Sequence, residues 1–409
     1  MRVLVLGAGL LGVTSAYYLQ QLGHEVTVVD RHATPAAKAR GRVAPSSFVP
    51  PSRAASPAPA GPGVMLVRRL RALVVALRAK WPRAARPDPL ENMVRLGAYS
   101  RETVRALRDE AGVPQAQRSA GLLNFYMDRN AFEAATARAP RLHALGCEAQ
   151  CLSAEDTVQT EPALTAMREQ LAGAFFAAED PSRDPAAFAA SMVFLCRAAG
   201  VRFLTNHTVV ALHEGTGSLN QVELTDGDGQ TVFLRAHAYL LALGTASVSH
   251  ADALGIDMPL NFVREYTAII PVKDVTRAPR HSLHDQSGKL RIKRIETPEG
   301  DALRVSALVR AVDDNETFEP DSDRFDAIKR RVNLLLPGAT DIPNARLHTA
   351  VHAVSADGLP LIGKTRLRNL FLNTAPGAPG WVNACGAGKS IARIVSGLRP
   401  ELAFSFTGM

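Results

Sequence analysis

The sequence predicts an α/β fold that begins with a Rossmann-type nucleotide-binding unit. Three observations near the amino terminus support this. An apolar stretch at residues 3–6 runs directly into the pattern Gly7-x-Gly9-x-x-Gly12, a helical pattern follows, and a second apolar stretch ends at Asp30. A buried strand, a glycine turn that opens a helix, and an acid after the next strand are the parts of a dinucleotide-binding βαβ unit. Here they occur in the required order.

Each part of this unit has a physical task. The first glycine permits the tight turn, the second lets backbone N–H groups approach a pyrophosphate, and the third lets the helix pack on the strand. The helix amino terminus faces the phosphates, and Asp30 accepts hydrogen bonds from the adenosine ribose. The residues that we expect to form this site are Val3, Leu4, Val5, Leu6, Gly7, Ala8, Gly9, Leu10, Leu11, Gly12, Val13, Thr14, Ser15, Ala16, Tyr17, Asp30 and Arg31.

Composition indicates a two-domain protein without nucleic acid as a partner. The chain has 409 residues with 46% hydrophobic content, enough to bury two cores. The net charge of +8 is largely local, because residues 68–86 carry seven basic side chains and no acid. A surface for nucleic acid would interleave cations with aromatic side chains, and this stretch offers only Trp81.

Residues 65–81 predict an amphipathic helix, with leucines at helical spacing and arginines opposite them. Such a helix either lies on an anionic membrane or packs against the rest of the protein. The chain shows neither a secretory signal nor a membrane-spanning apolar run, so we expect a protein that is cytoplasmic or peripheral to the inner face of a membrane. The four sparse cysteines favour a reducing compartment.

No metal site is expected. Histidines 348 and 352 have the spacing of a helical metal pair but lie in a predicted strand without further ligands. The cluster of His281, His284 and Asp285 is expected to be a solvated, turn-like loop.

The remaining pattern predicts a second set of strands and a closing strand–helix unit. Helices are expected at 93–112 and 131–146, strands at 200–204, 208–212, 221–224, 231–234 and 238–243, mainly strands over 259–312, and finally a strand at 369–373 followed by a helix at 381–396.

The order of these motifs resembles a known family. The glycine turn at 7–12, the segments 242–247 and 355–363, the strand 369–374 and the helix start with Gly-Trp at 380–381 are similar to the FAD-dependent amine oxidoreductases of the D-amino-acid oxidase superfamily. The similarity is strongest to the small subunits of D-amino-acid dehydrogenases in the glycine-oxidase-like branch.

The resemblance implies a Rossmann-type FAD-binding domain with a second, substrate domain built on a mixed β-sheet. The FAD-binding domain is expected to be discontinuous, over 1–90, 186–256 and 345–409, and the substrate domain to cover 91–185 and 257–344. The resemblance also implies further flavin contacts at Val209, Gly244, Gly377, Gly380, Trp381 and Val382.

The implied reaction is the oxidative deamination of D-amino acids to 2-oxo acids and ammonia, with electrons passed to a quinone-type acceptor. Tyr266 and Arg294 are the expected substrate contacts. His352 stands where the family places an arginine that binds the substrate carboxylate, and residues 40–45 depart from the family's flavin loop. An imidazole cannot reproduce a bidentate arginine contact. Two hypotheses therefore stand: an active dehydrogenase, and a diverged relative of weak or no activity that serves as a flavin-binding, partner or regulatory protein.

Overall fold

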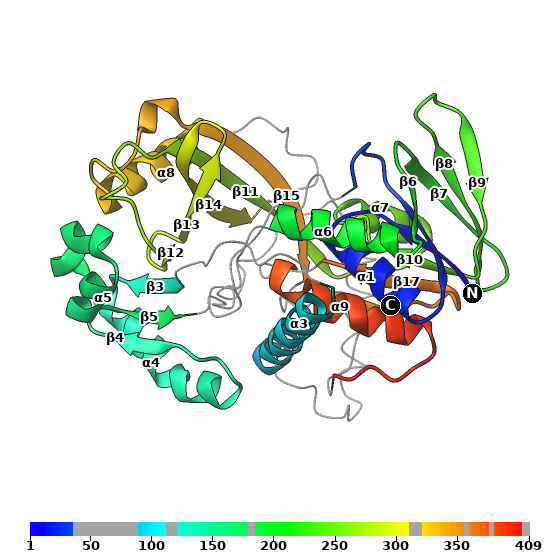
Figure 1. The fold of residues 1–409 in the computed structure, drawn as a ribbon, viewed down its shortest axis with the longest axis horizontal. Helices are drawn as coiled ribbons and strands as arrows, with labels where there is room; N and C mark the ends of the chain where they lie inside the picture. Colours follow the sequence, from blue (N-terminus) through cyan, green and yellow to red (C-terminus); the bar gives the residue numbers. More distant parts are fainter. Residues whose placement is uncertain are drawn as a thin grey trace, which may run out of the picture.

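The computed structural model shows two large β-sheets side by side, each with its own helices (Figure 1). The predicted helix at 65–81, the segment 40–45 and Gly377 lie outside the described residues, and of Trp381 and Val382 only the helical backbone is described. The structure describes residues 1–35, 89–111, 121–178, 185–310, 321–355, 360–375 and 380–402.

The first sheet has six strands, and its central strands are parallel. Their residues are apolar and buried, as both faces of such a sheet are covered. The strands, in spatial order, are β16 (Leu361–Lys364), β17 (Leu370–Thr374), β10 (Ala238–Leu241), β1 (Arg2–Leu6), β2 (Glu25–Val29) and β6 (Arg202–Leu204).

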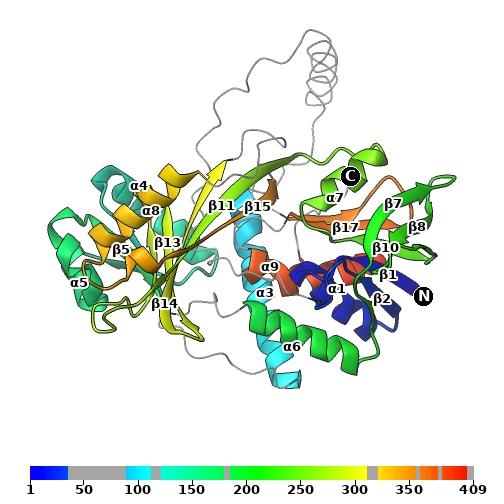
Figure 2. The ribbon, with the colours of Figure 1, turned by 90° about the horizontal axis from the view of Figure 1, so that it is seen from above.

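Helices cover one face of this sheet, and a small sheet covers the other (Figure 2). The helices α1 (Leu10–Gln21) and α9 (Gly380–Val395) cross so closely that a Cβ at Gly388 would lie 2.8 Å from the backbone of Thr14. The other elements that pack around the first sheet are α3 (Pro89–Ala111), α6 (Pro185–Ala198), β7 (Thr208–Glu214), β8 (Leu219–Thr225), β9 (Thr231–Leu234) and α7 (Ala246–Ala253).

The second sheet has eight strands and is mixed, because β12 and β3 run parallel while the other neighbours run antiparallel. In spatial order its strands are β15 (Arg346–Ser355), β11 (Leu260–Pro271), β14 (Gly300–Arg310), β13 (Leu290–Thr297), β12 (Ser282–Asp285), β3 (Leu122–Tyr126), β5 (Gly173–Ala177) and β4 (Gln150–Leu152).

The two faces of the eight-stranded sheet differ in chemistry, because side chains alternate along each strand. One face is apolar and packs on α8 (Ser322–Leu335) through Phe325, Ile328 and Val332. The opposite face, which we call the polar face, carries Glu265, Arg304 and other charged side chains. Figure 2 shows the sheet with α8 on one side and with α3 and α9 on the other. The remaining helices near this sheet are α4 (Arg129–Ala144), α5 (Ala154–Thr160), η2 (Pro162–Gln170) and η3 (Ile342–Asn344).

The predicted fold class is confirmed, and the predicted strands and helices within the described residues are present. The expected loop around His284 is wrong: His284 and Asp285 belong to the buried strand β12. The carboxylate of Asp285 is fully buried against Arg331, 2.7 Å from its Nε, so an ion pair rather than solvent satisfies it.

The expected domain boundaries differ from the packing at two elements. Strand β15 pairs with β11 in the eight-stranded sheet, although we expected residues from 345 onward in the nucleotide-binding part. Helix α3 contributes Leu96 and Leu107 to the core beside the six-stranded sheet, although we expected it in the substrate domain. The division into domains otherwise stays a prediction.

Cysteines and membrane segments give two further observations. All four cysteines are free; Cys196 and Cys385 are buried, and burial raises the pKa of each thiol to about 12, whereas Cys151 is exposed. Among the described residues, no helix combines the length and hydropathy needed to cross a membrane.

Candidate active site

The glycine turn between β1 and α1 has two packed glycines and one open one. Gly7 has φ +106°, and a Cβ there would lie 2.4 Å from the carbonyl oxygen of Ala242. A Cβ on Gly12 would lie 1.8 Å from the carbonyl oxygen of Gly7, so only glycine lets the helix rest on the turn. A Cβ on Gly9 would meet nothing within 4 Å. The open side of Gly9 therefore faces the space into which the turn would admit a ligand.

Asp30 is held against this turn. Its Oδ2 accepts a hydrogen bond from the N–H of Ala8 at 2.7 Å, and its Oδ1 lies 2.8 Å from both the backbone N and Nδ1 of His32. These contacts fix a carboxylate at the end of β2 beside the amino terminus of α1. Arg31, the neighbouring predicted contact, is exposed.

Two helix amino termini are free of acidic side chains. Gly9 caps α1 without any side-chain hydrogen bond, and neither α1 nor α9 has an acid in its first turn. Both ends therefore present N–H groups and a positive dipole end that favour an anionic ligand. Near the start of α9, the buried Oδ1 of Asn383 has no hydrogen-bond partner in the described residues, as expected of a group that meets a polar ligand.

The other expected nucleotide contacts lie at the edges of this region. Gly244 follows β10 with φ +65°, and a Cβ there would meet nothing within 4 Å. Val209 lies in β7 at an irregularity in the pairing with β8. These features together fit an extended dinucleotide: the open turn at Gly9, the fixed carboxylate of Asp30, the amino termini of α1 and α9, and the open backbone at Gly244.

A charged cluster occupies the polar face of the eight-stranded sheet. The Nε2 atom of His352 lies 3.0 Å from Oε2 of Glu265, whose side chain is only 4% exposed. The guanidinium of Arg304 approaches the other oxygen of Glu265 at 3.8 Å. One buried carboxylate thus holds an imidazole and a guanidinium.

Arg291 and His284 extend this cluster along the same face. The two residues are paired across β12 and β13, and Asn124 is paired with His284 across β3. Nδ1 of His284 lies 3.1 Å from Oδ1 of Asn124. Burial, with a smaller contribution from the charge of Arg291, lowers the pKa of His284 to about 3, so this imidazole is neutral. Sequence reasoning missed Glu265, Arg291, Arg304 and Asn124, because only the strand register shows that they share a face.

The three residues expected to contact substrate are not brought together. Tyr266 lies on the apolar face, 4% exposed, with its ring centroid 5.2 Å from that of Phe325. Arg294 also lies on the apolar face, where it forms an ion pair with Asp301. Only His352 lies on the polar face, and Glu265 already occupies its Nε2 atom.

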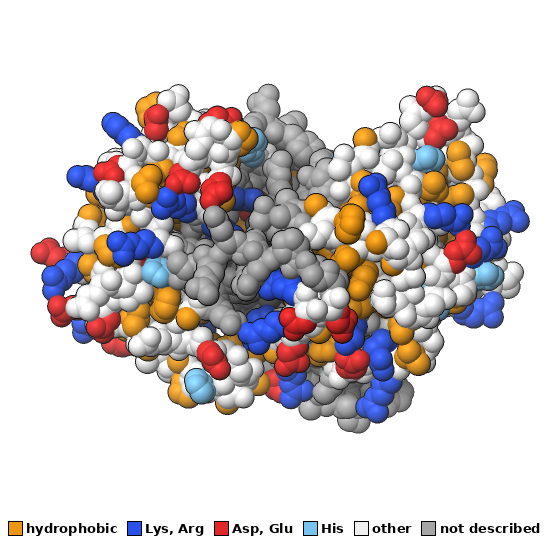
Figure 3. Space-filling model, viewed as in Figure 1, with side chains coloured by type: hydrophobic (Ala, Val, Ile, Leu, Met, Phe, Trp, Pro, Cys, Tyr) orange, Lys and Arg blue, Asp and Glu red, His pale blue; other side chains and the backbone are white. Residues whose placement is uncertain are grey.

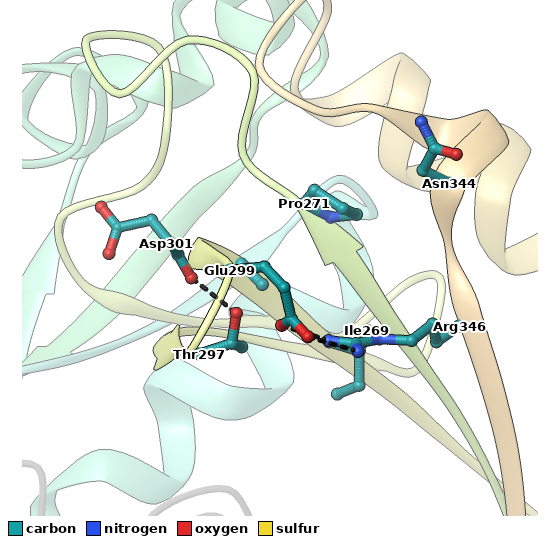
Figure 4. Close-up of a pocket in the computed structure, with 9 residues that line it drawn as sticks. Ile269, Pro271, Thr297, Glu299, Asp301, Asn344 and Arg346 are labelled. Atoms are coloured by element: carbon teal, nitrogen blue, oxygen red, sulfur yellow. Dashed lines mark hydrogen bonds and ion pairs between the residues drawn. The ribbon is translucent and has the colours of Figure 1, made fainter.

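A small pocket at the outer end of the same sheet does not match this site. It measures about 210 Å³ and is lined by residues such as Ile269, Pro271 and Asn344. Figure 4 shows the exposed ion pair of Glu299 and Arg346 within it. The pocket lies away from the glycine turn and contains no member of the Glu265 cluster.

The surface seen in Figure 3 carries Lys and Arg interspersed with Asp and Glu on both halves of the molecule. In the described part of the chain, no group of three His, Cys, Asp or Glu side chains is arranged to hold a metal ion.

Comparison with known proteins identifies the family. The model of the family described as "FAD dependent oxidoreductase" (DAO) matches residues 2–394. The chain belongs to this family. FAD is therefore its cofactor, and the open glycine turn with Asp30 fits the dinucleotide part of that molecule.

Relatives of this FAD dependent oxidoreductase are similar along nearly its whole length. A D-amino acid dehydrogenase of Methylobacterium radiotolerans is 33% identical, with 98% of this chain and 97% of the relative covered. A D-amino acid dehydrogenase of Rhizorhabdus wittichii is also 33% identical, with 98% of each covered.

Solved structures show the same fold. The glycine oxidase of Geobacillus kaustophilus superposes with a TM-score of 0.68 at 19% identity, covering 99% of this chain and 96% of that one. The L-proline dehydrogenase of P. horikoshii gives a TM-score of 0.73 at 15% identity, covering 98% of this chain and 95% of that one.

Proposed function

We propose that this FAD dependent oxidoreductase is a dehydrogenase of D-amino acids. The observation that carries the proposal is the similarity, at 33% identity over 98% of the chain, to proteins named D-amino acid dehydrogenase. The polar sheet face supports it, because it offers guanidinium groups to a substrate that carries a carboxylate.

The proposed reaction removes two electrons and two protons from the α-carbon and amine. FAD, when bound, supplies the acceptor of the hydride that leaves the α-carbon. The other proton leaves the nitrogen, water adds to the resulting imine, and a 2-oxo acid and ammonia are released. A quinone-type acceptor then takes up the electrons.

The chain's own contribution is positioning. We propose that Gly9, Asp30, Val209 and Gly244 hold the adenosine and pyrophosphate. The amino-terminal turn of α9, from Gly380 through Trp381 and Val382, would face the flavin with its positive dipole end, together with Gly377. Substrate would lie between that turn and the polar face, where Glu265 and the guanidinium groups orient it.

An absorption spectrum and an anaerobic bleaching assay test this function. We expect the purified protein to carry the flavin spectrum and to lose the oxidised flavin band on addition of D-alanine, with reoxidation by a soluble quinone. Gly9→Val provides a protein without cofactor as the control. Retained FAD without bleaching by a panel of D-amino acids, glycine and sarcosine would favour the alternative, a flavin-binding protein with a partner or regulatory role. The occupied His352 is the observation that favours this alternative.

The location of the protein is a second part of the proposal. We propose a cytoplasmic protein in which residues 65–81 either contact the inner face of a membrane, where a quinone would be within reach, or pack against the rest of the protein. Flotation with anionic vesicles at low salt that is lost at high salt would support the contact, since each basic residue near the surface contributes about 1 kcal/mol. Absence of flotation at both salt concentrations would reject the membrane contact and favour a segment that packs on the protein.

A further inference from the structure

Among the residues that the structure describes, neither His352 nor Arg294 is placed to bind the carboxylate of an amino acid. His352 is engaged with Glu265 at 3.0 Å, and an imidazole does not match the two oxygens of a carboxylate in any case. Arg294 lies on the apolar face with Asp301. If the proposed function holds, we expect another cation on the polar face to bind that group.

The strand register identifies the cations available. Arg291 is paired with Ser306 on β14, and Ser306 with Thr267 on β11, so the side chain of Arg291 shares a face with Glu265. Lys293 and Arg304 share this face as well, but each has an interaction partner. At the far end of the face, Arg346 is paired with Glu299.

Arg291 differs from these cations. No hydrogen bond or ion pair joins its guanidinium to any residue that the structure describes, and the residue is only partly exposed. Burial lowers its pKa, and the charge of Glu265 is the opposing influence. A partly buried cation without a hydrogen-bond or ion-pair partner among the described residues is suited to bind an anionic ligand through its guanidinium donors.

The balance of charges in the cluster also favours an anionic ligand. Among the described residues of this cluster, the carboxylate of Glu265 faces two guanidinium groups, those of Arg291 and Arg304. The neighbouring His284 is neutral, and Asn124 adds only an amide. Positive charge is therefore in excess where the sheet faces α3 and α9 (Figure 2).

We propose that Arg291 binds the substrate carboxylate. It would take the role of the family's arginine, at whose position this chain has His352. This inference rests on the proposed function for the identity of the substrate, but the binding of a carboxylate can be measured without turnover. Because Glu265 binds Arg304 and His352, these two residues would not be available to the substrate carboxylate. Arg291 would then be the partner of the substrate carboxylate.

The test compares Arg291→Gln, Arg291→Lys and His352→Gln with a matched control, Arg346→Gln, on the same face but at the outer end of the sheet. Each holoprotein is titrated with acetate and with benzoate, and binding is followed by the change in the flavin absorption spectrum. We expect Arg291→Gln to raise the Kd by roughly 10- to 100-fold, because a charge-assisted bidentate contact is lost. Arg291→Lys should recover part of the affinity, and His352→Gln and Arg346→Gln should stay within about twofold of wild type.

A specificity measurement separates binding of the carboxylate from structural damage. Wild type should favour D-alanine over D-alaninamide, which lacks the carboxylate, and Arg291→Gln should reduce that preference by a similar factor while turnover of the amide is retained. Unchanged Kd values in a flavin-loaded Arg291→Gln protein would overturn the inference. So would a larger loss in His352→Gln. Carboxylate binding that depends on Arg291 without any D-amino-acid turnover would sustain the inference and reject the proposed function.

Discussion

His352 and Glu265 meet across neighbouring strands, with Nε2 of the imidazole 3.0 Å from Oε2 of the buried carboxylate. The two residues lie two positions apart in the register of β15 and β11, on the polar face of the eight-stranded sheet. The contact means that neither side chain can be replaced without changing the environment of the other.

The first prediction follows from this pair. From the sequence alone, His352→Arg would restore a missing guanidinium and lower KM for D-amino acids. With Glu265 adjacent, we expect the new arginine to pair with that carboxylate, so that KM changes by less than about twofold. The double variant Glu265→Gln, His352→Arg should lower KM further than the single variant. Steady-state kinetics of wild type, the two single variants and the double variant form a double-mutant cycle. A single His352→Arg variant that lowers KM as much as the double variant would contradict the pairing.

A second prediction separates the glycines of the nucleotide turn. Gly9→Val should fold, because φ is −68° and the space beside it is open, but should lose FAD because its side chain fills the approach to the pyrophosphate. Gly12→Ala should fail to fold, since its Cβ would meet the carbonyl oxygen of Gly7 at 1.8 Å. Flavin content, circular dichroism and soluble yield distinguish the two outcomes. Retention of FAD by Gly9→Val would show that the cofactor does not approach this turn.

The crossing of α1 and α9 gives a third prediction. Gly388→Ala would place a Cβ 2.8 Å from the backbone of Thr14, so the helices must move apart. We expect the free energy of unfolding to fall by about 1–3 kcal/mol, as in other overpacked cores. The control is Lys389→Ala on the same helix, where a partly exposed ion pair with Glu401 is removed and about 0–1 kcal/mol is expected. Urea unfolding measures both, and equal losses would contradict the close packing.

Acid sensitivity gives a fourth prediction. The pKa of His284 is lowered to about 3 in the folded protein by burial, whereas an unfolded histidine titrates near 6.5. Between these values the unfolded state binds the extra proton, so the folded state loses stability as pH falls from about 6.5 toward 3, by at most about 1.4 kcal/mol per pH unit.

His284→Gln should therefore flatten the decline of the unfolding free energy between pH 6.5 and 4, relative to wild type. The exposed His143→Gln serves as the control and should leave the slope unchanged. Urea unfolding at several pH values provides the measurement, and equal slopes for wild type and His284→Gln would show that the imidazole is accessible to protons in the folded protein.

The local patterns in the sequence were sufficient for the nucleotide-binding unit. The turn from Gly7 to Gly12 and the acid at position 30 directly follow the strands that position them. Their spacing along the chain is therefore enough to predict that they lie close together in the fold. The closing unit of β17 and α9 was predictable for the same reason.

Only the tertiary structure decided which charged residues meet on the polar face. Glu265, Arg291, Arg304 and His352 come from four different strands, and a shift of one residue in any pairing would move a side chain to the other face. The sequence by itself therefore determined the family fold and the nucleotide turn, whereas strand register placed Tyr266 in the core and Glu265 beside His352.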